Sequence, residues 1–170
     1  MAALIVYFSR AGNNYVNGSI KDLTVGNTEV AAGMIRELTG GKVFRIEPVT
    51  AYSDDYSECI EEAKQDLKRN ARPELKAYPE SLEPYDTIYL GYPNYWGTMP
   101  AVVFTFLEKY DFADKMIRPF CTHEGSGMGD SERDIKQVCR NGNLMKGLAI
   151  HGARGGEAKA AIRLWIDQQQ

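Results

Sequence analysis

Apolar and polar positions along the chain fall into blocks that predict strands and helices in alternation. Five short runs rich in β-branched and aromatic residues are each followed by a stretch with apolar residues at helical spacing. The predicted strands are residues 3–9, 42–47, 87–92, 115–121 and 144–151. The predicted helices are residues 28–38, 55–69 and 157–168, with two more that open near Pro100 and Ser131.

Strands that alternate with helices favour a parallel sheet with right-handed crossovers and helices on both faces. Five such units indicate an α/β protein, a doubly wound three-layer α/β/α sandwich around a five-stranded parallel sheet. The strand order 2-1-3-4-5 fits that count and places a ligand crevice past the first and third strands. The periodicity supports this class without fixing the order. No repeat or linker interrupts the chain, so residues 1–170 are expected to form a single domain.

Charge and cysteine content narrow the possible functions. The formal net charge is −3, without the basic clusters that nucleic acid or a membrane surface would require. No apolar run approaches the roughly 18 residues of a membrane span, and the start of the chain lacks a signal peptide's basic region. Cys59, Cys121 and Cys139 are widely spaced and indicate neither a disulfide framework nor a zinc site. We therefore expect a reduced, cytoplasmic protein without a metal.

Small polar residues follow the first predicted strand, and others open the helix after it. Ser9, Arg10, Gly12 and Asn13 form the first group, and Gly26, Asn27 and Thr28 the second. Backbone N–H groups and the positive end of the helix dipole favour a phosphate there. The alternative is plain capping of the helix by Asn27 or Thr28, and Arg10 could equally pair with a phosphate or with a surface carboxylate.

The segment between these groups, residues 14–25, is about twice the usual loop length. It is consistent with a lid, a β-hairpin or a tolerated insertion.

The loop after the third strand places Tyr95 and Trp96 next to Gly97. Exposed aromatic side chains in a turn are costly unless they stack, and a flat aromatic ligand would be a natural partner. The alternative is that Trp96 packs on a neighbouring helix or on a partner subunit.

The loop after the fourth strand, residues 122–129, is rich in glycine. Its glycines partly resemble the GxGxxG motif of dinucleotide-binding proteins, but Asp130 stands where the third glycine would be. We therefore discount a dinucleotide site here. The loop's N–H groups could instead contact the polar edge of a ring. We interpret His123 as a hydrogen-bonded loop residue, Glu124 as a carboxylate that organises the loop, and His151 as structural. No catalytic residue is predicted.

Taken in order along the chain, these loops resemble those of the flavodoxin-like family. Residues 9–13 match the start of its Ser/Thr-rich phosphate loop, and residues 26–28 match the end of that loop after the insertion. Residues 92–100 are similar to the second flavin loop of flavodoxin-like reductases, and residues 122–127 to the third loop of a bacterial subgroup. The resemblance covers nearly the whole chain.

The resemblance implies noncovalently bound FMN, because one phosphate site suits FMN better than FAD. It assigns the phosphate to Ser9, Asn27 and Thr28 with the backbone of Arg10 and Gly26, and it leaves open whether Asn13 or Asn27 makes the amide contact. The isoalloxazine ring would be framed by Pro93, Asn94, Tyr95, Trp96, Gly97 and Thr98. The remaining edge of the ring would meet Glu124, Gly125, Ser126 and Gly127.

Two functions follow from the resemblance. One is a flavodoxin-type electron carrier between partner proteins, and the other is an NAD(P)H-dependent FMN oxidoreductase that acts on quinones or similar small acceptors. A flavin-binding regulatory protein is a weaker third reading. A monomer and a homodimer are both compatible with the sequence. The resemblance also implies that the peptide at Gly97 turns as the flavin changes its redox state.

Overall fold

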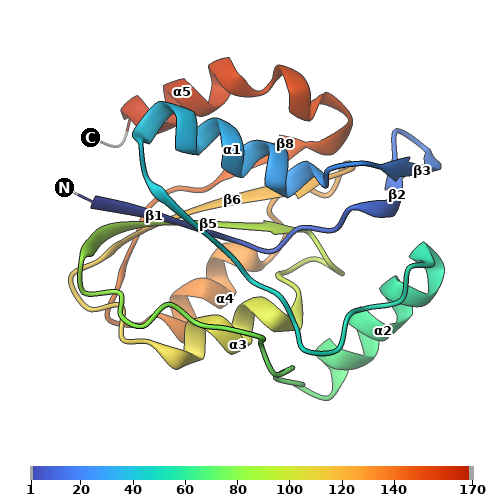
Figure 1. The fold of residues 1–170 in the computed structure, drawn as a ribbon, viewed down its shortest axis with the longest axis horizontal. Helices are drawn as coiled ribbons and strands as arrows, with labels where there is room; N and C mark the ends of the chain where they lie inside the picture. Colours follow the sequence, from blue (N-terminus) through green and yellow to red (C-terminus); the bar gives the residue numbers. More distant parts are fainter. Residues whose placement is uncertain (1, 169–170) are drawn as a thin grey trace.

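A mainly parallel β-sheet separates two layers of helices in the computed structural model, which describes residues 2–168 (Figure 1). Helices α1 (Asn27–Thr39) and α5 (Lys159–Gln168) cover one face of the sheet. Helices α3 (Ala101–Lys109) and α4 (Ser131–Val138) cover the other face. This arrangement confirms the predicted three-layer sandwich. In the part of the chain that the structure describes, no helix is long and apolar enough to cross a membrane.

The strands of the sheet lie in the order β4-β1-β5-β6, and both β7 and β8 pair with β6. Their bounds are β1 Ala2–Tyr7, β4 Lys42–Arg45, β5 Tyr85–Pro93, β6 Met116–His123, β7 Asn143–Leu144 and β8 Leu148–His151. All these pairs are parallel. The order is the predicted 2-1-3-4-5, with the fifth strand divided into β7 and β8. The division occurs where the Gly147 N–H leaves the sheet and donates to the Glu132 carboxylate of α4 at 2.9 Å.

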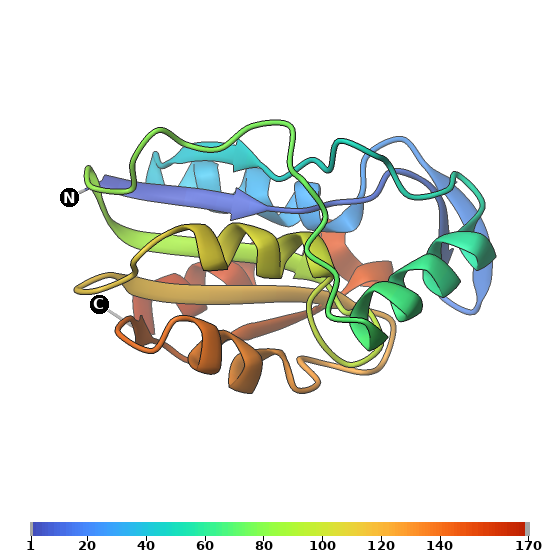
Figure 2. The ribbon, with the colours of Figure 1, turned by 90° about the horizontal axis from the view of Figure 1, so that it is seen from below.

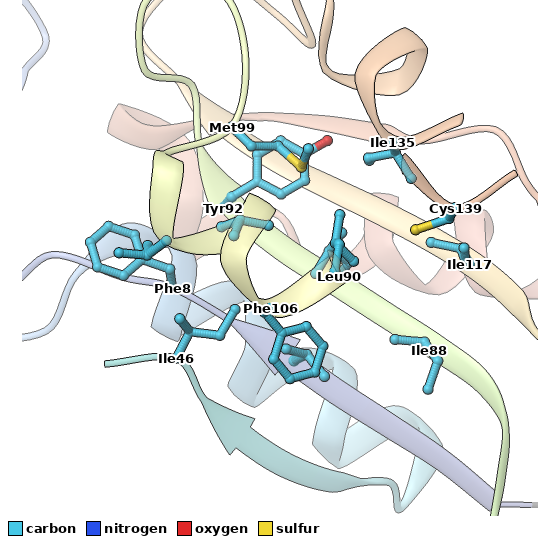
Figure 3. Packing of buried hydrophobic residues seen from close by; sticks show 14 of the residues in the cluster. Phe8, Ile46, Ile88, Leu90, Tyr92, Met99, Phe106, Ile117, Ile135 and Cys139 are labelled. Carbon is cyan, nitrogen blue, oxygen red and sulfur yellow. The ribbon is translucent and has the colours of Figure 1, made fainter. Parts of the chain in front are cut away.

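Side chains of β1 alternate between the two layers, as the period of a strand requires. Leu4 and Val6 join the core beneath α3 and α4, where Phe106 is fully buried (Figure 3). Ile5 belongs to the second core, which packs against Ile35 of α1 on the opposite face. The continuous apolar run at the start of the sequence therefore marks a central strand buried on both sides.

Helix α2 (Tyr56–Lys68) lies beside the end of the sheet (Figures 1 and 2). One stripe of this helix carries Tyr56, Ile60, Ala63 and Leu67, of which Ala63 is buried and the other three are half-buried. The fully buried residues also include Cys59 and Asp66. The Asp66 carboxylate accepts a hydrogen bond from the Tyr52 hydroxyl at 3.2 Å, so a polar residue occupies the inner face.

Two helices start differently from what the sequence suggests. Residues 131–134 resemble a capping box, but Asp130 is the N-cap of α4 and makes no side-chain cap bond. The Ser131 hydroxyl donates instead to the Met128 carbonyl at 2.6 Å and accepts from the Tyr92 hydroxyl at 2.8 Å. Helix α5 begins slightly later than predicted because a 3₁₀ segment, η1 (Gly152–Glu157), precedes it.

The insertion after the first strand is a β-hairpin of β2 (Gly12–Val16) and β3 (Ser19–Leu23). Asn17 and Gly18 form its turn with φ values of 52° and 86°. A two-residue turn with positive φ at both central positions fits the right-handed twist of the two paired strands. The Asn13 amide oxygen accepts from the Tyr56 N–H at 2.7 Å and so joins the hairpin to α2. Figures 1 and 2 both show the hairpin beside α2, past the carboxyl ends of the central strands.

Candidate functional site

A cavity of about 270 Å³ lies past the carboxyl ends of β1, β5 and β6, where the three predicted loops meet. Eight of the residues predicted for the site line it, namely Arg10, Asn27, Thr28, Pro93, Asn94, Tyr95, Glu124 and Ser126. Seven others are absent from the lining: Ser9, Gly26, Trp96, Gly97, Thr98, Gly125 and Gly127. The three loops therefore converge on one space, although their residues take different positions around it.

The first loop packs tightly against the beginning of α1. A Cβ on Gly26 would lie 2.3 Å from Ser9 Oγ and 2.5 Å from the Arg10 carbonyl oxygen, so the two segments touch through bare backbone. Ser9 Oγ accepts a hydrogen bond from the Glu29 N–H at 3.1 Å, which places it against the first turn of the helix. Gly26 is the N-cap and supplies no capping side chain. The first N–H groups of a helix lack intrahelical partners and carry its positive dipole end, so this end can receive an anion.

Arg10 extends from the first loop along the cavity wall. Its Nε donates to the Asn13 carbonyl at 3.1 Å and its Nη2 to the Asp54 carbonyl at 2.9 Å. No carboxylate among the described residues forms an ion pair with it, so the surface pairing considered from the sequence is not seen. The guanidinium therefore organises the loop while its positive charge remains available to a ligand in the cavity.

The second loop is held to the third by Asn94. Its backbone N–H donates to the Thr122 carbonyl at 2.8 Å, and its Nδ2 donates to the Gly127 carbonyl at 2.9 Å. Its side-chain oxygen accepts from the Gly97 N–H at 2.9 Å. One amide side chain thus fixes the shape of two loops at the edge of the cavity.

Residues 95–98 form a tight turn closed by backbone hydrogen bonds between Tyr95 and Thr98. Trp96 and Gly97 occupy its centre with φ values of 56° and 86°. A positive φ is unusual for a bulky residue such as Trp and stores strain. Strain of this kind is typical of ligand-binding turns.

Trp96 leans on α2. Its Nε1 donates to the Ile60 carbonyl at 2.7 Å, and the Lys64 ammonium lies 5.1 Å from the ring centroid. The ring is still 53% exposed. Of the two placements considered from the sequence, the structure has packing on a neighbouring helix, with one aromatic surface left open to solvent.

The third loop carries two side chains that the sequence assigned to loop organisation. His123 Nδ1 accepts from the Gly125 N–H at 2.9 Å, and burial, with His151 nearby, lowers the pKa of His123. Glu124 Oε2 accepts from the Asn17 N–H of the hairpin turn at 3.2 Å and lies 3.7 Å from His151 Nδ1. Glu124 Oε1 is buried next to Gly152 and has no hydrogen-bond partner among the described residues. Glu124 thus secures the hairpin over the cavity.

Five lining residues were not predicted as ligand contacts: Asn14, Tyr15, Tyr56, Thr122 and His123. Tyr15 of the hairpin stacks on Tyr56 of α2, with ring centroids 6.2 Å apart and planes 23° apart. The Thr122 hydroxyl is hydrogen-bonded to the Thr28 hydroxyl at 2.8 Å. The sequence does show an aromatic residue, Tyr15, close to the predicted phosphate loop. It does not show that Tyr15 contacts Tyr56, because that contact joins segments far apart in the chain.

Two thiols and the Tyr95 phenol lie near the cavity, and burial keeps all three in their neutral forms. Burial raises the pKa of the Cys59 thiol and raises the pKa of the Tyr95 hydroxyl well above its ordinary value. Burial also raises the pKa of Cys121 to about 12. A thiol nucleophile needs a lowered pKa, so neither cysteine is suited to nucleophilic catalysis.

A larger cavity of about 810 Å³ lies between α2 and the segments 48–52 and 71–74. It shares no lining residue with the loop cavity. Many of its charged side chains are engaged locally: Asp66 pairs with Arg69 at 2.8 Å, and Glu58 accepts from Ser53 Oγ at 2.6 Å. It does not lie where the three loops meet, so the loop cavity is the candidate site.

The fold and the loop cavity define a doubly wound α/β protein with a cavity at the switch between β1 and β5, the place where such sheets bind ligands. The chain belongs to the flavodoxin family, whose profile matches residues 19–169. A search of curated proteins found no significant match.

Solved structures agree with this assignment. A "putative flavoprotein" of Bacteroides eggerthii is 26% identical with a TM-score of 0.79, over 98% of this chain and 96% of that one. A second "Putative flavoprotein", from Bacteroides uniformis, is 27% identical with a TM-score of 0.77, and the match covers 98% of this chain and 97% of that one. A flavoprotein of Lactobacillus acidophilus in complex with FMN is 17% identical with a TM-score of 0.66, over 92% and 97%, and shares the fold.

Proposed function

We propose that the protein binds FMN noncovalently in the loop cavity and carries electrons between partner proteins. The observation that carries this proposal is the convergence of three loops and the N-terminus of α1 on a cavity without a reactive nucleophile. Membership of the flavodoxin family supports FMN as the ligand, as does the FMN bound by the Lactobacillus acidophilus flavoprotein. When bound, FMN supplies the redox chemistry, and the protein supplies orientation and electrostatics.

The residues at the beginning of α1 fit the phosphate of FMN. The Gly26 position has no room for a Cβ because Ser9 and the Arg10 backbone fill that space, so glycine lets the first loop lie directly against the start of α1. Thr28, Asn27 and Arg10 line the cavity at this end, and Ser9 supports them from behind. We assign the amide contact to Asn27, because Asn27 lines the cavity whereas the Asn13 side chain is turned to the Tyr56 N–H of α2.

The second and third loops would hold the ring. Asn94, Tyr95 and Pro93 line the cavity directly, and the half-exposed Trp96 stands at its border on α2. Ser126 and the backbone of Gly125 and Gly127 would meet the polar edge. Ring stacking contributes about 0.5–1.5 kcal/mol per aromatic pair beyond burial.

A carrier makes fewer demands on the site than an oxidoreductase does. The loop cavity measures about 270 Å³, just below the usual range of about 300–1,000 Å³ for ligand cavities. A neighbouring cavity of about 240 Å³ shares Arg10 with it. An electron carrier needs no pocket for a nicotinamide or a quinone, because its partner is a protein surface.

The test is anaerobic titration of the purified protein, followed by its visible absorption spectrum. We expect one FMN per chain, no reduction by NADPH or NADH, and reduction by dithionite. Rapid bleaching by either nucleotide would replace the carrier with an NAD(P)H-dependent oxidoreductase. A protein that stays colourless and binds no added FMN would overturn the whole proposal.

Replacing Gly97 by alanine should change the gap between the two one-electron potentials of bound FMN. Gly97 has φ of 86°, its N–H donates to Asn94, and its carbonyl accepts from the Asp130 N–H at 2.6 Å. A Cβ at positive φ adds strain of about 1 kcal/mol, which would change the relative energies of the two orientations of this peptide. For a one-electron step, that energy corresponds to a shift in potential of roughly 40 mV.

Spectroelectrochemistry measures both potentials. Gly18→Ala is the matched control, because Gly18 also has φ of 86° with nothing within 4 Å of a Cβ, but lies in the hairpin turn. Equal potentials in the wild type and in Gly97→Ala would exclude a role of this peptide in setting the potentials.

A further inference from the structure

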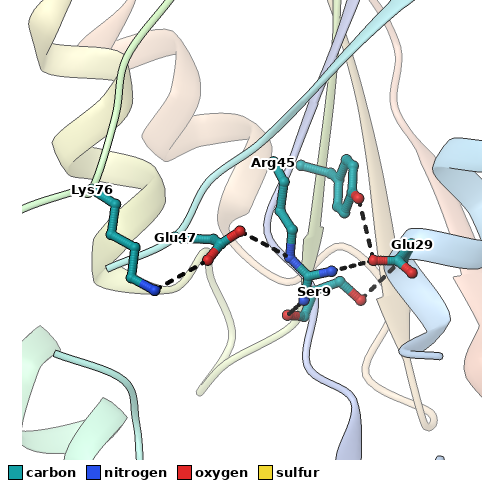
Figure 4. Close-up of polar contacts among 6 residues, drawn as sticks. Ser9, Glu29, Arg45, Glu47 and Lys76 are labelled. Atoms are coloured by element: carbon teal, nitrogen blue, oxygen red, sulfur yellow. Dashed lines mark hydrogen bonds and ion pairs between the residues drawn. The ribbon is translucent and has the colours of Figure 1, made fainter. Parts of the chain in front are cut away.

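A polar network lies behind the proposed phosphate site, at the ends of β1 and β4 and the first turn of α1 (Figure 4). The Arg45 guanidinium forms an ion pair through Nη1 with Glu29 Oε1, and its Nη2 donates to the Ser9 carbonyl at 3.3 Å. Ser9 Oγ in turn accepts from the Glu29 N–H. One arginine therefore contacts both segments that would surround a phosphate.

The contact with Ser9 affects the direction of the next backbone donor. In a trans peptide the C=O and N–H groups point in opposite directions. Because Arg45 holds the Ser9 carbonyl, the Arg10 N–H of the same peptide is directed away from Arg45. Arg10 lines both the loop cavity and the neighbouring cavity that Arg45 and Ser9 line. The hydrogen bond thus keeps an acceptor away from an incoming anion and turns a donor toward the loop.

The contact with Glu29 affects charge. A carboxylate in the first turn of a helix interacts well with the helix dipole, but it repels a phosphate at the same end. The Arg45 charge offsets that of Glu29. Other groups face this pair: the Tyr7 hydroxyl donates to Glu29 Oε1 at 3.3 Å, Glu47 Oε1 lies 4.0 Å from Arg45 Nε, and Lys76 lies 3.4 Å from Glu47.

We propose that Arg45 is a positioning residue that gives the site its preference for a phosphorylated flavin over the same flavin without phosphate. The proposal rests on the proposed FMN site and deepens it. Arg45 acts through Ser9 and Glu29 and needs no contact with the ligand. The side chains of Arg45 and Glu29 are 37% and 31% exposed, and ion pairs this exposed contribute little to folding stability. Substitutions here should leave the protein folded, so binding can be measured directly.

The experiment is a double-mutant cycle on the binding of FMN and riboflavin to the apoprotein, measured by quenching of flavin fluorescence. Arg45→Gln should weaken FMN binding about tenfold and riboflavin binding by less than about twofold. Glu29→Gln in that background should restore most of the FMN affinity, because the uncompensated charge is gone. Arg45→Lys should fall between the wild type and Arg45→Gln. Arg36→Gln removes an exposed charge at the far end of α1 and should change neither affinity.

The outcomes separate this proposal from the one on which it rests. If the wild type binds FMN and Arg45→Gln weakens FMN and riboflavin equally, or weakens neither, the role of Arg45 is wrong and the FMN site stands. If Glu29→Gln restores nothing, charge compensation is wrong. If the wild type binds neither flavin, the FMN site itself is wrong and the role of Arg45 falls with it.

Discussion

Gly26→Ala is expected to lower the affinity for FMN about 100-fold, equivalent to about 2.7 kcal/mol. The added Cβ would lie 2.3 Å from Ser9 Oγ and 2.5 Å from the Arg10 carbonyl oxygen. The first loop must then move away from the start of α1, since backbone atoms cannot be relieved by a rotamer change. The donors that would surround the phosphate separate as a result. Titration of the apoprotein with FMN measures the effect.

Gly33→Ala is the matched control within the same helix. Gly33 is exposed, and nothing lies within 4 Å of a Cβ built there. Alanine in the interior of a helix is about 0.5–1 kcal/mol more favourable than glycine, so this variant should be slightly more stable and bind FMN unchanged. Thermal unfolding of both variants separates binding from stability. A folded Gly26→Ala protein with wild-type FMN affinity would exclude the phosphate from this position.

The layers of the fold could be predicted because they depend on local patterns. The apolar run from Leu4 to Val6 identifies a central strand, and the alternation of strands with amphipathic helices implies the parallel sandwich. The order of strands also agrees, although the fifth strand is divided into β7 and β8 at the segment where the Gly147 N–H donates to Glu132 of α4. A contact between residues fifteen positions apart is not visible in the pattern of either segment.

The site could be predicted as three loops but not as a set of contacts. The structure places Arg10, Asn94 and Glu124, one from each of the three predicted loops, around one cavity. It did not show that Tyr15 would meet Tyr56, because that stacking requires α2 to lie at the end of the sheet instead of flat on it. The same displacement explains why Trp96 reaches the Ile60 carbonyl. The long-range packing of α2 therefore accounts for most of the site contacts that could not be predicted from the sequence.

Arg118→Leu is expected to destabilise the protein by about 2–5 kcal/mol. Arg118 is 3% exposed on β6, and its guanidinium donates to the Trp165 and Ile166 carbonyls at 2.9 Å each and to the Tyr89 hydroxyl at 2.9 Å. The two carbonyls lie in the last turn of α5, where intrahelical donors are missing. Each buried acceptor left without a donor costs about 1–3 kcal/mol, and leucine supplies no donor. Denaturant unfolding followed by circular dichroism measures the loss.

Arg163→Leu is the control. It tests whether the loss of stability in Arg118→Leu comes from the buried hydrogen bonds of Arg118 and not from the removal of any arginine. Arg163 is exposed on α5, and its replacement should change the free energy of unfolding by no more than about 0.5 kcal/mol. Helix α5 packs against α1 in the same core, through Ile162 and Ile35. Loosening α5 should therefore also weaken FMN binding, since α1 carries the proposed phosphate site. A stable Arg118→Leu protein would show that the carbonyls of α5 find other donors, and that α1 does not depend on this anchor.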